Sequence, residues 1–137
     1  MSNRDTVQQI YEAFGQGDVP AILERLAPDV AWEDFEDNSG QNAGVPWLAR
    51  RDGRDAVAGF FQSVGGGDLA VTGFEVRSII GDGEKVVAEC VIDATVVATG
   101  RSFRDEDAHV WTFDDAGQVT AFRHYVDTGK HLAAYKG

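Results

Sequence analysis

Residues 69–127 read LAVTGFEVRSIIGDGEKVVAECVIDATVVATGRSFRDEDAHVWTFDDAGQVTAFRHYVD, and they contain most of the β-structure that the sequence predicts. Four β-rich runs follow one another in this stretch, over residues 69–80, 85–98, 102–113 and 118–127. Short turns separate the runs, at residues 81–83, 100–101 and 114–117. Turns this short join neighbouring strands in antiparallel order. The stretch therefore predicts a four-stranded antiparallel meander.

Upstream of these strands, apolar residues recur with the period of a helix. One apolar stripe predicts a helix over about residues 3–16, and it consists of Val7, Ile10, Tyr11 and Phe14. Asp18 is placed to cap a second, shorter helix that ends before Pro28. Residues 30–35 alternate as a short strand, and a third helix is expected over about residues 54–64, where three glycines follow.

This order of elements predicts an α+β fold, with residues 1–137 as a single domain. Long strands twist, so the bent antiparallel sheet should curl around the helices and leave a pocket between them. Residues 86–97 are apolar on both faces, which favours a homodimer through the outer face of the sheet. Residues 36–51 form the longest irregular stretch, in which Trp47 either closes over the pocket as a lid or packs within the loop.

The composition of the chain disfavours some classes of binding partner. The chain has 137 residues, and 12 Lys plus Arg minus 23 Asp plus Glu gives a net charge of -11. Such an acidic chain is a poor match for nucleic acid or an anionic membrane. The single cysteine, Cys90, lies in an apolar run and is expected to be a small buried hydrophobe. With no apolar stretch of signal-peptide type, we expect a cytoplasmic protein that binds a small ligand.

Strand alternation places three acid/base groups on faces that would turn into the pocket: Asp34, His109 and His124. Burial raises the pKa of a carboxyl group and lowers that of an imidazole. Both pKa values then approach neutral pH, which suits the two groups to general acid/base catalysis. Asp107 shares the face of His109 and would favour its imidazolium, so the charge of His109 stays open. The alternative is that the histidines are hydrogen-bonded core residues and that Asp34 is a solvated acid. The expected substrate-binding walls are Phe14, Trp32, Trp47, Phe60, Trp111, Phe122 and Val126.

Other motifs are missing from the sequence. There is no G-x-S-x-G elbow, no P-loop and no dinucleotide fingerprint after a strand. A divalent metal among Asp34, Asp37, His109 and His124 would lack the short ligand spacing of known sites. We therefore expect neither a cofactor nor a metal.

Three strings spread over residues 10–127 carry a family resemblance. They are IYEAFGQGDVPAILERLAPDVAWEDF (residues 10–35), GRDAVAGFFQSVGGG (residues 53–67) and HVWTFDDAGQVTAFRHYVD (residues 109–127). They resemble the nuclear transport factor 2-like superfamily, in its SnoaL-like polyketide cyclase and ketosteroid isomerase branch. The resemblance implies a cone-shaped α+β barrel, a bent antiparallel sheet wrapped around three helices, often dimeric through its outer face.

The resemblance also implies roles for the candidate residues. Asp34 matches the general-base aspartate of the isomerases. His109 falls where the isomerases have a protonated acid in the oxyanion hole and where the cyclases tend to have a histidine. His124 falls where the cyclases and the related limonene epoxide hydrolases carry an aspartate. The oxyanion tyrosine of the isomerases lines up with Ile10, and Tyr11 is expected to point elsewhere because helix neighbours lie about 100° apart.

Three functions remain open. The first is a cofactor-independent enzyme that moves a proton beside a carbonyl of a small apolar or aromatic substrate, by isomerisation, cyclisation or dehydration. Asp34 would be its base, His109 would stabilise the enolate oxygen and His124 would assist. The second is a non-catalytic module of the same fold that holds a hydrophobic ligand or dimerises. The third, an epoxide hydrolase, needs an arginine between carboxylates, but Arg104 and Arg123 should face away from the two histidines.

Overall fold

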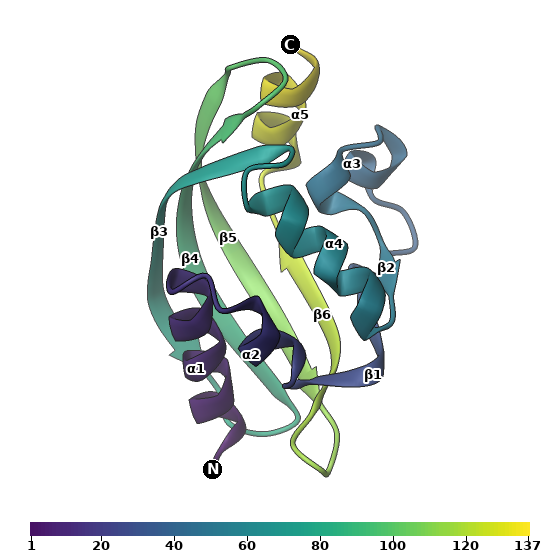
Figure 1. Cartoon of the computed structure of the whole chain (residues 1–137), viewed down its shortest axis with the longest axis vertical. Helices are drawn as coiled ribbons and strands as arrows, with labels where there is room; N and C mark the ends of the chain where they lie inside the picture. The colour runs from purple at the N-terminus through teal and green to yellow at the C-terminus, as the bar shows by residue number, and fades with distance from the viewer.

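A curved sheet of six strands forms one layer of the protein, and α1, α2 and α4 lie on one side of it (Figure 1). The computed structural model describes residues 1–137. The strands are β1 (Leu26–Trp32), β2 (Arg51–Asp52), β3 (Leu69–Ile80), β4 (Lys85–Val96), β5 (Ser102–Phe113) and β6 (Val119–Tyr125). Their order across the sheet is β2-β1-β6-β5-β4-β3. The α+β fold predicted from the sequence is confirmed.

The long strands β3 to β6 form the predicted antiparallel meander. Pairing between β4 and β5 runs without a shift in register, from Lys85 opposite Thr112 to Thr95 opposite Ser102. By contrast, β3 has two register shifts against β4. Irregularities of this kind bend a strand and increase its twist. They curve β3 around α1, which gives the sheet the concave face that holds the site (Figure 1).

Helices cover this face and one end of the sheet. They are α1 (Asn3–Gly15), α2 (Val19–Leu23), α3 (Ser39–Asn42), the 3-10 helix η1 (Pro46–Leu48), α4 (Arg54–Val64) and α5 (Thr128–Lys136). A capping box starts α1, because the Ser2 hydroxyl accepts from the Asp5 backbone and the Asp5 carboxylate accepts from the Ser2 backbone. The core under the helices is aromatic: the Trp32 ring stacks on Phe122 with centroids 4.1 Å apart.

The first strand differs from its prediction in position and in pairing. β1 begins at Leu26 and ends at Trp32, whereas alternation predicts a strand over residues 30–35. It pairs in parallel with β6, the last strand of the chain. Residues so far apart in sequence carry no local signal for this pairing, so the sequence pattern alone does not reveal it.

Residues 36–51 do not form an open lid. They contain α3, η1 and the start of β2, and the Trp47 side chain is only 1% exposed. Its ring meets Tyr135 of α5 edge-on with centroids 5.7 Å apart. A buried indole is stable when its N–H finds a partner, and Trp47 Nε1 donates to His131 Nδ1 at 2.9 Å. Of the two alternatives for Trp47, packing within the fold is therefore the one observed.

Two smaller sequence expectations concern Cys90 and the membrane. The Cys90 side chain is buried in β4, as the apolar run predicts. None of the helices has both the length and the apolar character needed to cross a membrane.

Candidate active site

A cavity of about 70 Å³ lies between the concave face of the sheet and helices α1 and α4. Fifteen of its 19 lining residues are hydrophobic, so the walls are apolar, but a cavity of this size holds a ketone ring only when the aromatic walls move apart. The four polar residues are Asp107, His109, His124 and His131. Six of the expected wall residues line it, namely Phe14, Trp32, Trp47, Phe60, Trp111 and Phe122. Val126 does not, because it lies beyond the end of β6.

A wider groove of about 940 Å³ opens to solvent between α1 and β3. Tyr11, Phe14 and Phe74 line both the groove and the cavity. The Phe74 ring lies 5.3 Å from the Phe14 ring and 5.8 Å from the Tyr11 ring, so aromatic side chains stand between the two spaces. The buried acid and base groups lie in the cavity, and we place the candidate site there.

A chain of hydrogen bonds links α1 to β5 on one side of the cavity. The Tyr11 hydroxyl lies 2.6 Å from His109 Nδ1, and Trp111 Nε1 donates to the same hydroxyl at 3.0 Å. Because an indole N–H can only donate, the hydroxyl proton goes to Nδ1 and His109 carries its own proton on Nε2. This Nε2 faces Asp107 Oδ2 at 3.6 Å. The hydrogen-bonded chain therefore ends at His109, and the Asp107 carboxyl group lies just beyond it.

The expectation that Tyr11 points away from the pocket is wrong. Ile10 and Tyr11 both line the cavity. Helix α1 packs against both β3 and β4 of the curved sheet, so two neighbouring residues of the helix both reach the cavity. Burial raises the pKa of Tyr11 well above its usual range, so its hydroxyl keeps its proton at neutral pH.

Burial also settles the charge of His109, which the sequence leaves open. Loss of solvent, helped by the nearby His124, lowers the pKa of His109 to about 3, although Glu33 acts in the opposite direction. His109 is therefore a neutral imidazole at physiological pH. Cys90 lies 3.8 Å from His109 Nδ1, and burial raises the pKa of its thiol to about 12. The thiol is therefore unreactive as a nucleophile.

Asp107 is the buried carboxyl group of the cavity. Its side chain is 3% exposed, and its Oδ1 has no hydrogen-bond partner. Burial and the neighbouring Asp105 carboxylate together raise the pKa of Asp107 to about 7, while His124 opposes the shift. A carboxyl group with such a pKa exchanges its proton near neutral pH, which is what general acid/base catalysis requires.

His124 is the cationic member of the site. Its Nδ1 lies 2.7 Å from Glu33 Oε2 as an ion pair, although the angle is poor for a hydrogen bond. The backbone N–H of His124 donates to Glu33 Oε1 at 2.7 Å. Burial alone would lower the pKa of His124, but the Glu33 carboxylate outweighs it and raises the pKa. No hydrogen bond within the protein uses its Nε2.

Asp34 does not reach the cavity, contrary to the expectation from strand alternation. Its side chain is 47% exposed and pairs with Arg50 at 2.8 Å. The physical reason is Glu33, the one non-glycine residue with positive φ, at 61°. This left-handed residue breaks the alternation after Trp32, so that Glu33 turns inward to His124 while Asp34 turns outward.

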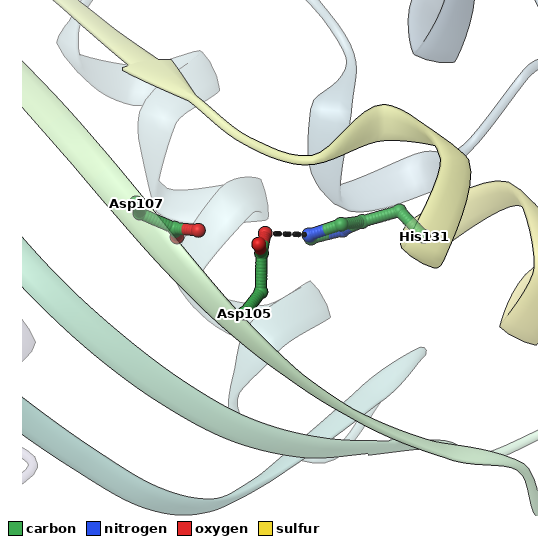
Figure 2. Close-up of side chains that lie close together, drawn as sticks. All are labelled: Asp105, Asp107 and His131. Atoms are coloured by element: carbon green, nitrogen blue, oxygen red, sulfur yellow. Dashed lines mark hydrogen bonds and ion pairs between the residues drawn. The ribbon is translucent and has the colours of Figure 1, made fainter.

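A second buried network adjoins Asp107, as Figure 2 shows for Asp105, Asp107 and His131. His131 of α5 hydrogen-bonds through Nε2 to Asp105 Oδ2 at 2.8 Å. The Asp127 backbone N–H donates to the same Oδ2 at 3.2 Å. Burial would raise the pKa of Asp105, but these hydrogen bonds lower it to about 2. Asp105 is therefore a carboxylate at every physiological pH.

The same three side chains come close enough to meet one cation, since an oxygen of each aspartate and a nitrogen of His131 lie within 4.8 Å of one another. Their hydrogen bonds point to another arrangement. Trp47 donates to His131 Nδ1, so the proton of the neutral ring is on Nε2 and points at Asp105. A metal at Nε2 would displace this proton. The cluster is built as a hydrogen-bonded network, and we assign it no metal.

Sequence reasoning missed part of this site. The strand period correctly places Asp105 and Asp107 on the face of His109, but nothing in the pattern distinguishes a carboxyl group that is catalytic from one that is merely buried. His131 was not predicted because the closing helical turn shows no clear amphipathic period. Glu33 was not predicted because alternation assigns it to the opposite face of the strand. The one signal in the sequence that could have found this network is the histidine in the closing helical turn, His131.

The comparisons with known proteins agree with this fold. A family model described as a SnoaL-like domain matches residues 7–122, and the chain belongs to this family of the nuclear transport factor 2-like superfamily. No curated protein matches the chain.

Solved structures of the same fold cover essentially the whole chain. A nuclear transport factor 2-like protein of unknown function from Burkholderia pseudomallei is 29% identical, covers 100% of both chains and superposes with a TM-score of 0.79. A second one, from Burkholderia thailandensis, is 25% identical, covers 98% of this chain and 97% of its own, and has a TM-score of 0.82. A protein named as a candidate polyketide cyclase from Pseudomonas putida is 18% identical, covers 98% of each chain and has a TM-score of 0.74, which shows the shared fold.

Proposed function

We propose that the protein is a cofactor-independent enzyme that moves a proton beside a carbonyl group of a small apolar or aromatic ligand. Isomerisation, cyclisation and dehydration all use this step. One observation carries the proposal: a buried carboxyl group, Asp107, has an unpartnered oxygen in the same apolar cavity as His109 and His124. An unpartnered buried oxygen costs stability, and a ligand that exchanges a proton with it would give it a partner.

The three polar groups divide the work in this proposal. Asp107 takes the role that the sequence suggested for Asp34, because its carboxyl group faces the cavity and exchanges a proton near neutral pH. His124 is a cation whose Nε2 is free, so it would donate to the oxygen on which negative charge develops. His109 is neutral and held by Tyr11, and its Nε2–H would orient the Asp107 carboxylate.

The experiment measures proton abstraction without knowledge of the product. The protein is incubated in deuterium oxide with a panel of small cyclic ketones and aromatic ketones, and deuterium at the carbon beside the carbonyl is followed by mass spectrometry. We expect incorporation with the unmodified protein and a loss of at least about 100-fold in Asp107→Asn. Glu106→Gln is the matched control, since this exposed neighbour points to the other face of β5.

The outcomes separate the competing functions. A ketone that binds, as shown by quenching of tryptophan fluorescence, but gains no deuterium would indicate the non-catalytic binding module. Equal rates in Asp107→Asn and the unmodified protein would also refute the role of Asp107. Epoxide hydrolysis lacks its arginine, because none lines the cavity. Arg123 instead packs over the Phe35 ring at 4.8 Å.

The partner and the location remain part of the proposal. We propose a homodimer through the outer face of the sheet, where Val87 and Val110 lie opposite each other in register and are each only partly buried. Glu89 and Glu106 interrupt this face with charge. Sedimentation equilibrium tests it, and a monomer mass at micromolar concentration would refute it. A cytoplasmic location likewise stays a prediction.

A further inference from the structure

We propose that Asp105 and Asp107 form a proton-sharing carboxyl pair, in which Asp105 is held as the carboxylate and Asp107 carries the proton that the ligand exchanges. The chemical role of the pair rests on the proposed function, whereas the pairing itself does not. The two residues are separated by one position on β5, so both side chains point to the same face. Figure 2 shows the Asp107 carboxyl group directed toward that of Asp105.

Hydrogen bonding decides which member of the pair is ionised. Asp105 Oδ2 accepts from two donors, His131 Nε2 at 2.8 Å and the Asp127 backbone N–H at 3.2 Å. Donors of this kind stabilise the charged form of a carboxyl group. Asp107 has no donor within hydrogen-bonding distance, since Oδ1 has no partner and Oδ2 lies 3.6 Å from His109 Nε2. A proton shared by the pair therefore resides on Asp107.

Two further residues act through Asp105 and are positioning residues. Trp47 Nε1 donates to His131 Nδ1, which leaves the ring proton on Nε2. His131 then presents this proton to Asp105. All three side chains are at least 98% buried, so water does not compete with these hydrogen bonds. The network from Trp47 to Asp105 fixes a negative charge at one end of the cavity.

The other groups near Asp107 do not supply a competing proton. On its own strand it faces Asp105 and His109. Across the sheet, Cys90 of β4 lies opposite Asp107, and His124 of β6 lies opposite the neighbouring His109. The helices bring Tyr11 and His131. Tyr11 and Cys90 keep their protons at neutral pH, and His109 stays neutral. His124 is paired with Glu33, which favours its imidazolium. Asp107 is thus the carboxyl group in the cavity that changes protonation near neutrality.

The step moves one proton and no electrons. With Asp107 protonated, its O–H bond breaks as the proton passes to an oxygen or carbon of the ligand, and the carboxylate remains beside Asp105. With Asp107 ionised, a C–H bond of the ligand breaks and the proton returns to the carboxylate. The negative charge of Asp105 favours the return, so the pair is reset after each transfer.

The test titrates the ligand-free protein by carbon NMR of its aspartate carboxyl groups. We expect one buried carboxyl signal to titrate near neutral pH, and its absence in Asp107→Asn assigns it to Asp107. In Asp105→Asn the same midpoint should fall by about 1 pH unit or more, because the like charge is gone. Glu106→Gln is the matched control on the opposite face of β5, and it should leave the midpoint in place.

Two results would overturn the proposal. One is an Asp107 midpoint that is the same in Asp105→Asn and in the unmodified protein. The other is a midpoint near neutrality that belongs to Asp105. If Asp105→Asn fails to fold, nitrogen NMR of the unmodified protein gives the answer, since the network requires the His131 ring to carry its proton on Nε2. A ring that carries its proton on Nδ1 would contradict the network.

The titration tests the carboxyl pair and the deuterium exchange tests the proposed function, so either result can be negative while the other is positive. A pair that titrates as expected in a protein that exchanges no ketone proton would refute the proposed function and leave the pair intact. If deuterium exchange depends on Asp107 but the titration midpoint of Asp107 is the same in Asp105→Asn, the proposed function stands and the carboxyl pair is refuted.

Discussion

Replacement of Asp107 with Asn should change how stability depends on pH. A carboxyl group whose pKa is raised by folding keeps its proton to a higher pH in the folded than in the unfolded protein. Its contribution to the free energy of unfolding is therefore fully present below the unfolded pKa of about 3.9 and is lost as pH rises through the folded pKa. For Asp107 the folded value is about 7. Asn does not titrate, so the variant lacks this loss.

The magnitude follows from linkage. Each pH unit between the unfolded and folded pKa values corresponds to about 1.4 kcal/mol. Between about pH 5 and pH 8, nearly two such units apply to Asp107, so the unmodified protein should lose about 3 kcal/mol relative to Asp107→Asn. Differences due to other groups, such as the depressed pKa of His109, are common to both proteins and cancel to first order.

Urea unfolding followed by tryptophan fluorescence measures this difference, because Trp32, Trp47 and Trp111 are all buried. The free energies of unfolding of both proteins are compared at the two pH values, with Glu106→Gln as the exposed control. A difference that changes by less than about 1 kcal/mol, or that changes in the opposite direction, would refute the reasoning that Asp107 is protonated in the folded protein.

Three further predictions concern the groups around Asp107. The ring of His109, whose pKa is about 3, should show no titration by NMR between about pH 5 and pH 8, and a midpoint in that range would contradict its burial. Glu33→Gln should lower the raised pKa of His124, seen as a lower NMR midpoint; an unchanged midpoint would show that another group holds the charge. Trp47→Phe removes the donor of a buried hydrogen bond and should destabilise the protein by about 1–3 kcal/mol in urea unfolding. Trp32→Phe is its control, since Trp32 Nε1 has no partner, and an equal loss there would argue that ring volume alone matters.

Local patterns in the sequence sufficed for most of the fold. The helical stripe of α1 and the two-residue period of β5 are repeated along their elements, so each position supports the same conclusion. The same period correctly predicted that His109 is buried, because β5 keeps its register with β4 throughout. Features that depend on distant residues were out of reach. The parallel pairing of β1 with β6 joins opposite ends of the chain, and no periodicity records it.

The acid of the site was misplaced for a different reason. A single residue with positive φ reverses the alternation that the prediction assumes, and Glu33 has a side chain that ordinarily avoids this conformation. Its ion pair with buried His124 holds it there. The sequence shows two adjacent acids, Glu33 and Asp34, but only the backbone decides which one turns inward. Local strain of this kind is often found at functional sites.

The arrangement of charge gives the proposed proton transfer a direction. Asp105 is a fixed carboxylate on one side of Asp107, and His124 is an imidazolium paired with Glu33 on the other. When ionised Asp107 takes a proton from the ligand, the negative charge leaves the neighbourhood of Asp105 and appears on the ligand oxygen. There it meets the free Nε2–H of His124. Like-charge repulsion is relieved and opposite-charge attraction is gained in one step, and in an apolar cavity both effects are stronger than in water. In the proposed transfer, the two buried networks would together favour the transition state over the ground state.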